Sequence, residues 1–99
     1  MSINRVMICG RLTRDPEMRS TAGGLAVMGL GVAVNDRRRN HQTGEWEDVP
    51  NYVDCTMFGP YAQAMERRLS KGAKVAIDGR LRWSQWESDG QRRSKLEVV

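Results

Sequence analysis

The sequence predicts an all-β fold, a five-stranded Greek-key barrel with one short α-helix between the third and fourth strands. Apolar and polar residues alternate in five stretches, turn-forming residues separate these stretches, and only one stretch has helical spacing. The predicted strands cover residues 3–12, 25–35, 51–59, 74–83 and 93–99. The chain has 99 residues and no internal repeat, so we expect a single domain over residues 1–99.

The first predicted strand, residues 3–12, has two different faces. Val6 and Ile8 lie on one face, and Met7 and Cys9 on the outward face, because successive side chains of a strand point in opposite directions. A strand-to-strand contact between subunits leaves only an apolar face or a free edge as its trace. We therefore expect the region of Met7 and Cys9 to contact another copy of the chain.

Glycines indicate where the barrel bends. Gly10 predicts a bulge or a close approach within the first strand. Residues 13–24 contain Asp-Pro and Gly-Gly pairs, which predict a connecting loop. In the second strand, residues 25–35, Gly29 and Gly31 share one face and leave room for strong curvature or for another backbone.

The third predicted strand, residues 51–59, carries large aromatic side chains on its polar face. Its core face consists of Val53, Cys55 and Met57. Tyr52, Thr56 and Phe58 alternate with these residues and point outward. A fold that needed only a core would place both aromatic rings inside, so the outward face is expected to have a flat, apolar partner. In a basic chain, an unstacked nucleic-acid base is such a partner.

Residues 36–50 predict a polar hairpin with a Thr-Gly pair near its tip. Arg37, Arg38 and Arg39 begin the hairpin, and Trp46 follows the turn. This cationic arm suits single-stranded nucleic acid, because guanidinium groups contact phosphates or stack and an indole offers a platform for bases. The alternative is a flexible charged loop with no binding role.

Residues 59–72 predict the single helix. Pro60 suits the first helical position, and Gly72 suits the C-terminal stop. The helix is expected to cover one side or end of the sheet with an apolar stripe. This stripe consists of Ala62, Met65 and Leu69.

The fourth predicted strand, residues 74–83, continues into a second hairpin that turns at a Ser-Asp-Gly sequence. Alternation places Arg80, Arg82 and Trp86 on one face, as a row of basic and aromatic side chains. Trp83 has the parity of the core face, so we expect it to pack inside.

The composition favours some functional classes over others. The formal net charge is +4, from 16 Lys and Arg against 12 Asp and Glu, and arginine dominates, which favours contacts with phosphates. Cys9 and Cys55 lie far apart without a metal-binding or redox spacing, and we expect both to be small buried side chains in a reducing cytosol. No apolar run approaches the ~18 residues that span a bilayer, and no signal peptide is present. We therefore expect a cytoplasmic protein with no membrane partner.

Catalytic chemistry has little support in the sequence. His41 is the single histidine, which argues against a multi-histidine metal site or a histidine-based hydrolase. Asp15, Asp54 and Asp78 are the acids that a metal-dependent nuclease would need, but they lie on different predicted elements without ligand spacing. We expect no enzymatic activity, no metal and no cofactor.

Five strands with a helix between the third and fourth is the order of an OB-fold. The sequence also resembles the bacterial single-stranded DNA-binding protein family over nearly its whole length. The matching segments are NRVMICGRLTRDPEMR at 4–19, TGE at 43–45, MFG at 57–59, LSKGAKV at 69–75 and GRLRWSQW at 79–86. The resemblance implies a nucleoid-associated OB-fold homotetramer that binds single-stranded DNA with little sequence preference in replication, recombination and repair. Family members continue into a disordered tail with an acidic tip that recruits replication and repair proteins, whereas this chain ends at Val99.

The resemblance also implies individual roles. Tyr52 stands where the family has a stacking tryptophan, and Phe58 and Trp86 match two further stacking positions. Another family tryptophan falls nearest Arg38, so either a guanidinium stacks there or Trp46 replaces it. A histidine that the family often has just after the first of these aromatics, and that a subunit contact could need, is replaced here by valine.

The predicted DNA contacts combine stacking aromatics with cations that neutralise phosphates. They are Tyr52, Phe58, Trp86, Trp46, Arg37, Arg38, Arg39, Arg80, Arg82, Arg11 and Lys95. Arg14 and Arg19, in the first predicted loop, suit phosphate contacts and plain solvation equally. An alternative with the same fold is an RNA-binding or primosome-type adaptor that bridges proteins as a dimer.

Overall fold

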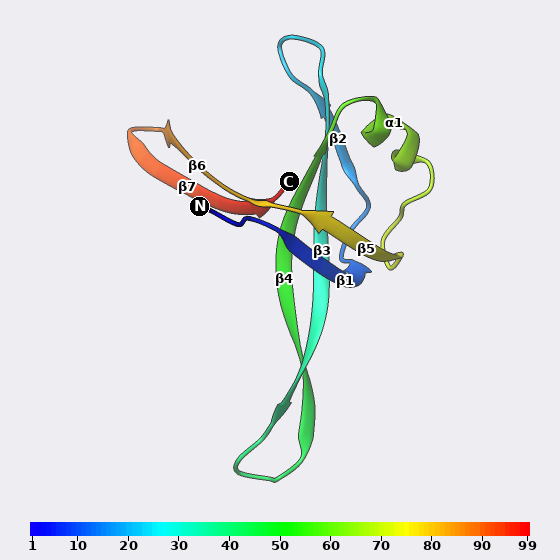
Figure 1. Cartoon of the computed structure of the whole chain (residues 1–99), viewed down its shortest axis with the longest axis vertical. Coiled ribbons are helices and arrows are strands. Elements are labelled where there is room, and N and C mark those ends of the chain that lie inside the picture. Colours follow the sequence, from blue (N-terminus) through cyan, green and yellow to red (C-terminus); the bar gives the residue numbers. More distant parts are fainter.

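The computed structural model describes all residues 1–99 and contains seven strands and one helix (Figure 1). The elements in chain order are β1 (Val6–Leu12), β2 (Glu17–Ser20), β3 (Ala26–Arg39), β4 (Trp46–Phe58), α1 (Pro60–Glu66), β5 (Lys74–Gly79), β6 (Leu81–Ser88) and β7 (Gln91–Val98). The all-β class with one helix after the third long strand is therefore confirmed. No helix is long and apolar enough to cross a membrane.

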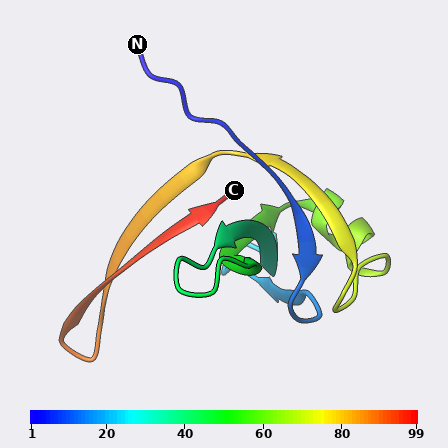
Figure 2. The same ribbon diagram turned by 90° about the horizontal axis from the view of Figure 1, so that it is seen from below.

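The strands form one strongly curved sheet in the order β5-β1-β3-β4-β7-β6, and β2 pairs with β3. The first and last strands of this order, β5 and β6, are consecutive in the chain and separated only by Arg80. Figure 2 shows them as one continuous arc that passes from the β1 side to the β7 side. The five predicted strands thus correspond to β1, β3, β4, the β5–β6 pair and β7, and they close into a barrel.

The core lies between the inner faces of β3 and β4 and the strands that wrap around them. β3 and β4 are antiparallel in one register from Val27 opposite Phe58 to Arg39 opposite Trp46. Met28 is fully buried, and the remaining buried members of the core cluster are Leu12, Leu30, Val32, Cys55, Ala62 and Val98. The predicted core face of the third strand is therefore confirmed, because Cys55 is buried and Val53 and Met57 pack against the core cluster.

Two hairpins extend beyond the barrel. The far ends of β3 and β4 form a long arm, and β6 and β7 form a second hairpin that leaves the barrel in a different direction (Figure 1). The arm contributes to a longest dimension of 54 Å against 36 and 35 Å in the other directions. The predicted polar hairpin at residues 36–50 is thus mostly strand, because the ladder continues to Arg39 and Trp46.

Gly10 lies where β1 crosses β3, and a side chain there has no room. A Cβ atom at this position would overlap the carbonyl oxygen of Ala33 and lie 3.0 Å from a side-chain carbon of Val32. The close approach predicted for Gly10 is therefore present.

The predicted loop at residues 13–24 contains a short strand. β2 pairs with residues 26–29 of β3, so the prediction that all of residues 13–24 form a connecting loop was wrong. Four residues between turn signals are too short for alternation to identify a strand, and its pairing with β3 stabilises it.

The helix is shorter than predicted. It begins at Pro60 as expected but ends at Glu66, well before Gly72. The backbone N–H of Gly72 donates to the carbonyl oxygen of Leu12, and the N–H of Leu12 donates to Ala73. These bonds draw the segment onto β1, so Gly72 does not terminate the helix. Ala62 is fully buried, and the other two residues of the predicted stripe also pack on the core.

The fourth predicted strand is two strands, and the expectation for Trp83 was wrong. Trp83 is 59% exposed, and its cross-strand neighbour Leu96 is 60% exposed. Up to Gly79 the chain pairs with β1, and from Leu81 it pairs with β7. The face of β6 that carries Trp83 therefore extends past the barrel interior, where no other strand packs against it. Leu81, which has the same parity as Trp83, is exposed for the same reason.

The two cysteines have different environments. Cys55 is buried, as predicted, whereas Cys9 is exposed and the prediction that it is buried was wrong. Cys9 lies on the outward face of β1, next to the equally exposed Met7. Burial raises the pKa of the Cys55 thiol to about 11, and the charges of Asp54 and Glu97 act in the same direction. The Cys55 thiol is therefore neutral at physiological pH.

We expect Gly10→Ala to lower the free energy of unfolding by more than about 1 kcal/mol, because its methyl group forces β1 away from β3. Gly23→Ala is the matched control, since a Cβ at Gly23 meets nothing within 4 Å. Urea unfolding followed by circular dichroism compares the two variants with the parent chain. Equal midpoints for both variants would contradict the steric role of Gly10.

Candidate functional site

A basic hollow lies between β2 and the inner face of the β6–β7 hairpin, and we call it the hairpin groove. Its lining residues are Arg19, Arg82, Ser84, Trp86, Lys95 and Glu97. Three of these, Arg82, Trp86 and Lys95, were predicted as site residues from the sequence. The fold thus brings together one indole and three cationic side chains from three strands.

The register of the β6–β7 hairpin determines which side chains enter the groove. Arg82 lies opposite Glu97, and Trp86 lies opposite Arg93, all on one face. The hairpin turns at Asp89 and Gly90, whose φ angles of 53° and 75° are typical of the two-residue turns that fix such a register.

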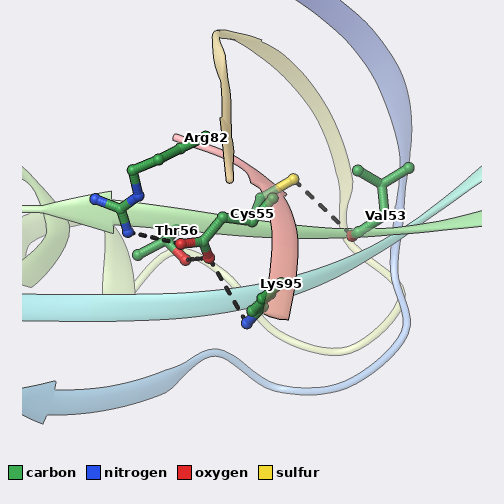
Figure 3. Close-up of polar contacts among 6 residues, drawn as sticks. Val53, Cys55, Thr56, Arg82 and Lys95 are labelled. Atoms are coloured by element: carbon green, nitrogen blue, oxygen red, sulfur yellow. Dashed lines mark hydrogen bonds and ion pairs between the residues drawn. The ribbon is translucent and has the colours of Figure 1, made fainter. Parts of the chain in front are cut away.

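Glu97 is the one charged side chain that the structure buries, with 6% of its surface exposed. Its Oε1 accepts a hydrogen bond from Nη2 of Arg82 at 2.6 Å, and its Oε2 accepts one from the hydroxyl of Thr56 at 2.5 Å. The Nζ atom of Lys95 lies 3.6 Å from the same Oε2. Figure 3 shows Arg82 and Lys95 approaching this carboxylate from different sides, with Thr56 beside it.

These contacts determine the charge of Glu97. Burial alone would raise the pKa of its carboxyl group. The hydrogen bonds from Thr56 and Arg82, together with the charges of Lys95 and Arg82, outweigh burial and hold that pKa below its ordinary value. Glu97 is therefore an ionised acid at the base of a cationic groove.

The prediction that Thr56 points into solvent was wrong, because Thr56 lies beneath β7. It is 8% exposed, and its hydroxyl group donates to Glu97. The parallel contact of β4 with β7 at Cys55 and Val98 brings the two strands together at this point. The outward face of β4 is therefore covered locally, although its alternation is as predicted.

Phe58 connects the groove to the end of β4. It is partly buried, and the guanidinium carbon of Arg82 lies 5.0 Å from the centroid of its ring. A cation over a ring face at this distance makes a favourable cation–π contact. One face of Phe58 is thus covered by Arg82.

A second surface, which we call the arm face, lies on the outer side of β3 and β4. Tyr52 on this face is 75% exposed, and Trp46 is 61% exposed. Arg39 lies opposite Trp46, and Arg37 lies opposite Asp48 with an ion pair of 3.8 Å. Arg38 lies on the opposite face by alternation, so the three predicted arginines do not form one cluster.

The arm face continues onto β1 and β5. Lys74, Arg11, Ala33 and Tyr52 are cross-strand neighbours in one row over four strands. Nη1 of Arg11 donates to the carbonyl oxygen of Gly72 at 3.0 Å, which holds its side chain along the sheet. Arg11 therefore lies near Tyr52, as a joint role in binding would require.

The hairpin groove and the arm face are separate but connected. Tyr52 and Phe58 share a face of β4, yet six residues of strand place them roughly 20 Å apart. A second hollow shares Arg19 and Lys95 with the hairpin groove and extends to Arg14 and Asp54. Arg14 and Arg19, which the sequence left open, thus lie along the path between the two surfaces.

Arg80 is not among the residues that line the groove. It lies at the junction of β5 and β6, where its backbone exchanges hydrogen bonds with Val99. Arg93 lies opposite Trp86 and is not among the predicted residues, although its parity is that of Lys95 and it could have been found from that parity. Glu97 has this parity too, but its burial depends on packing that alternation does not describe.

Two of the three acids considered for a metal, Asp15 and Asp78, have other partners. Asp15 accepts a hydrogen bond from the backbone N–H of Lys71 at 2.7 Å, and Asp78 pairs with Arg5 at 2.7 Å. No group of three or more His, Cys, Asp or Glu side chains converges to hold a metal ion.

The closed barrel, its strand order and the helix after β4 define this chain as an OB-fold, the class predicted from the sequence. The chain belongs to the single-strand binding protein family, whose model matches residues 3–99. The resemblance described above is thereby confirmed.

Individual relatives match nearly all of the chain. The single-stranded DNA-binding protein of Treponema pallidum is 40% identical over 96 residues, which cover 97% of this chain and 53% of that protein. The protein of the same name from Borreliella burgdorferi is 38% identical over 98 residues, with coverages of 97% and 64%. The chain thus spans between half and two thirds of the length of these two relatives.

Solved structures agree with the fold. A deletion mutant of the single-stranded DNA binding protein from Thermus aquaticus has a TM-score of 0.83 at 36% identity, covering 97% of this chain and 46% of that one. Plasmodium falciparum SSB, solved in complex with ssDNA, has a TM-score of 0.84 at 23% identity, with coverages of 99% and 86%. The second likeness shows the shared fold.

Ionised Glu97 makes stability depend on pH in the acid range. Because its pKa is lowered on folding, its contribution is present above the ordinary pKa of glutamate and is lost as pH falls through the folded value. We expect the parent chain to lose more unfolding free energy between pH 7 and about pH 3 than Glu97→Gln does, because the loss runs from the ordinary pKa of glutamate down through the lowered one. Urea midpoints at both pH values measure this difference, and identical losses would contradict it.

Proposed function

We propose that this chain binds single-stranded DNA with little sequence preference, by stacking bases on exposed aromatic rings and neutralising phosphates with arginine and lysine. One observation carries the proposal. The hairpin groove brings Trp86 together with Arg19, Arg82 and Lys95. On the opposite face of the same hairpin, Trp83 lies across from Leu96, and the single cation, Arg92, lies across from the acid Glu87. Stacking platforms beside cations are what an unpaired strand needs, because every base has a π-face and every nucleotide a phosphate.

The relatives support the choice of ligand. The relatives from Treponema pallidum and Borreliella burgdorferi are both named single-stranded DNA-binding protein. The chain spans only part of these relatives. We propose that it acts in replication, recombination and repair and that it has no enzymatic activity of its own. We also propose that replication and repair proteins are recruited through a C-terminal tail, as the family resemblance implies.

The arm face supplies a second set of contacts in this proposal. Tyr52 and Arg11 would hold a strand on the barrel, and Trp46 with Arg37 and Arg39 would hold it on the arm. We assign the role of the missing family tryptophan to Trp46, because it shares a face with Tyr52. Arg38 faces the other side of the arm, so it would contact DNA only where a DNA strand wraps around the hairpin.

Assembly as a homotetramer is also part of the proposal. β1 pairs with β5 along Val6–Arg11 but with β3 only at Arg11 and Leu12, which leaves the other edge of residues 6–10 without a ladder. Met7 is 71% exposed beside this edge, and Cys9 is exposed as well. An unpaired edge with an apolar face favours pairing with another copy of β1.

Titration with oligo-dT tests the proposed function directly. We expect quenching of tryptophan fluorescence and an affinity that falls steeply with salt, because bound phosphates displace counterions. Competition with poly-U separates a DNA-binding role from an RNA-binding one. A titration without quenching and without salt dependence would rule out the proposed mechanism.

We expect Trp86→Ala to weaken oligo-dT binding by about 1 to 3 kcal/mol, the contribution of a stacked base in this class of protein. The loss should be similar on other base sequences, because stacking does not read base edges. Trp83→Ala is the matched control, since Trp83 lies on the same strand but faces away from the groove. Equal losses from both variants would contradict the assignment of the binding face.

We expect Met7→Glu to shift the solution mass toward the monomer, because the new carboxylates of two adjacent copies would repel in a desolvated interface. Tyr61→Glu, at an exposed position on α1, adds the same charge elsewhere and should leave the mass unchanged. Sedimentation or light scattering measures both. A parent chain that is monomeric would overturn the proposed assembly.

A further inference from the structure

Glu97 has no role in the binding mechanism described so far, yet it lies at the base of the hairpin groove. An acid among phosphate-binding cations weakens the positive potential that attracts the DNA backbone. Its own surface is 6% exposed, so it cannot contact a bound strand to any useful extent. Any effect of Glu97 on binding must therefore pass through the side chains that it holds.

Arg82 is the main candidate for such an effect. Its Nη2 donates to Glu97, its guanidinium covers one face of Phe58, and its side chain is 45% exposed to the groove. Carboxylate and phosphate oxygens are equivalent partners for a guanidinium group, because both accept its hydrogen bonds in the same geometry. The remaining donors of Arg82 can thus be reached by a phosphate while Glu97 still holds Nη2.

Lys95 makes an exchange of partners possible. When Arg82 leaves Glu97, the acid keeps the hydrogen bond from Thr56 and the ion pair with Lys95 at 3.6 Å. A buried carboxylate left alone would carry a large desolvation cost. Two cations around one acid mean that one of them can move to the DNA while the other remains.

We propose that Glu97 is a positioning residue that takes the place of a backbone phosphate in the unbound groove and holds Arg82 over Phe58 until DNA takes the guanidinium. The exchange provides a cation for the phosphate and uncovers a ring face of Phe58 for a base at the same time. This inference rests on the proposed function, because it assigns Phe58 and Arg82 to DNA binding.

Glu97→Gln tests the inference, since the amide keeps the size of the acid and can still bond to Thr56 and Arg82. Without the competing charge, oligo-dT affinity should rise about fivefold at low salt, the equivalent of the ~1 kcal/mol between unit charges 4 Å apart in water. The slope of log affinity against log salt should steepen by about 0.7, as for one further phosphate contact on a single strand. A brace with a purely structural role would instead weaken binding and leave the slope unchanged.

Glu87→Gln is the matched control for net charge. Glu87 lies on β6, in the same hairpin as Glu97 but on the opposite face, across from Arg92. It changes the formal charge of the chain by the same amount, yet its affinity and salt slope should stay within about twofold of the parent because its face is remote from the groove. An increase as large as that of Glu97→Gln would overturn the inference in favour of a general charge effect.

The dependence on Arg82 is tested in a second background. In Arg82→Gln, the further change Glu97→Gln should no longer steepen the salt slope, because the guanidinium that Glu97 withholds is absent. A slope that still steepens would assign the effect to Lys95 and overturn the role of Arg82.

Thermal unfolding shows whether Glu97→Gln is folded. If this variant folds poorly, a measurement on the unaltered chain tests the inference instead. In nitrogen-labelled protein, the guanidinium resonances of Arg82 should shift when oligo-dT is added, and unchanged resonances at saturation would overturn the exchange. Failure of the parent chain to bind oligo-dT would overturn the proposed function and this inference together. Binding by the parent chain with no gain in Glu97→Gln would overturn the inference alone.

Discussion

The β3–β4 ladder is the constraint on which the rest of the structure depends. Its single register runs from the barrel to the end of the arm, and side chains alternate along its whole length. The register that buries Met28 and Val32 is therefore the one that presents Tyr52 and Trp46 to solvent. A slip of one residue would exchange the two faces and remove both the core and the arm face. Stability and the binding surface are thus determined by the same hydrogen bonds.

The second constraint is the change of strand partner at Arg80. Up to Gly79 the chain pairs with β1, and from Leu81 it pairs with β7, so one bent strand both closes the barrel and begins the second hairpin. A Cβ at Gly79 would lie 2.5 Å from the carbonyl oxygen of Val99, so only glycine fits at this crossing. Because the hairpin leaves the barrel here, both of its faces reach solvent. One becomes the hairpin groove, and the other exposes Trp83.

The alternation of apolar and polar residues correctly predicted which side chains share a face of a strand. The outward position of Tyr52 was found in this way, as was the shared face of Arg82 and Trp86, whereas Phe58 is partly buried. Errors arose where the outcome depended on which layer covers a face. Trp83 has the parity of a core residue, but its strand has already left the barrel, and Cys9 lies on a face that nothing covers. Arg19 and Glu97 join the groove only through tertiary contacts, which a periodicity of two does not describe.

Burying one acid beneath a cationic surface has two opposing consequences. Glu97 accepts contacts from β4, β6 and β7 through Thr56, Arg82 and Lys95, so it fixes the hairpin to the barrel. An apolar residue in its place would leave the Thr56 hydroxyl without its partner and two cations in mutual repulsion. The same negative charge lowers the attraction of the groove for phosphates. In the proposed function, a weaker attraction for phosphates means that more of the binding free energy comes from stacking on Trp86 and Phe58. The acid that orders the groove would therefore also limit how strongly the groove holds a DNA backbone in the proposed function.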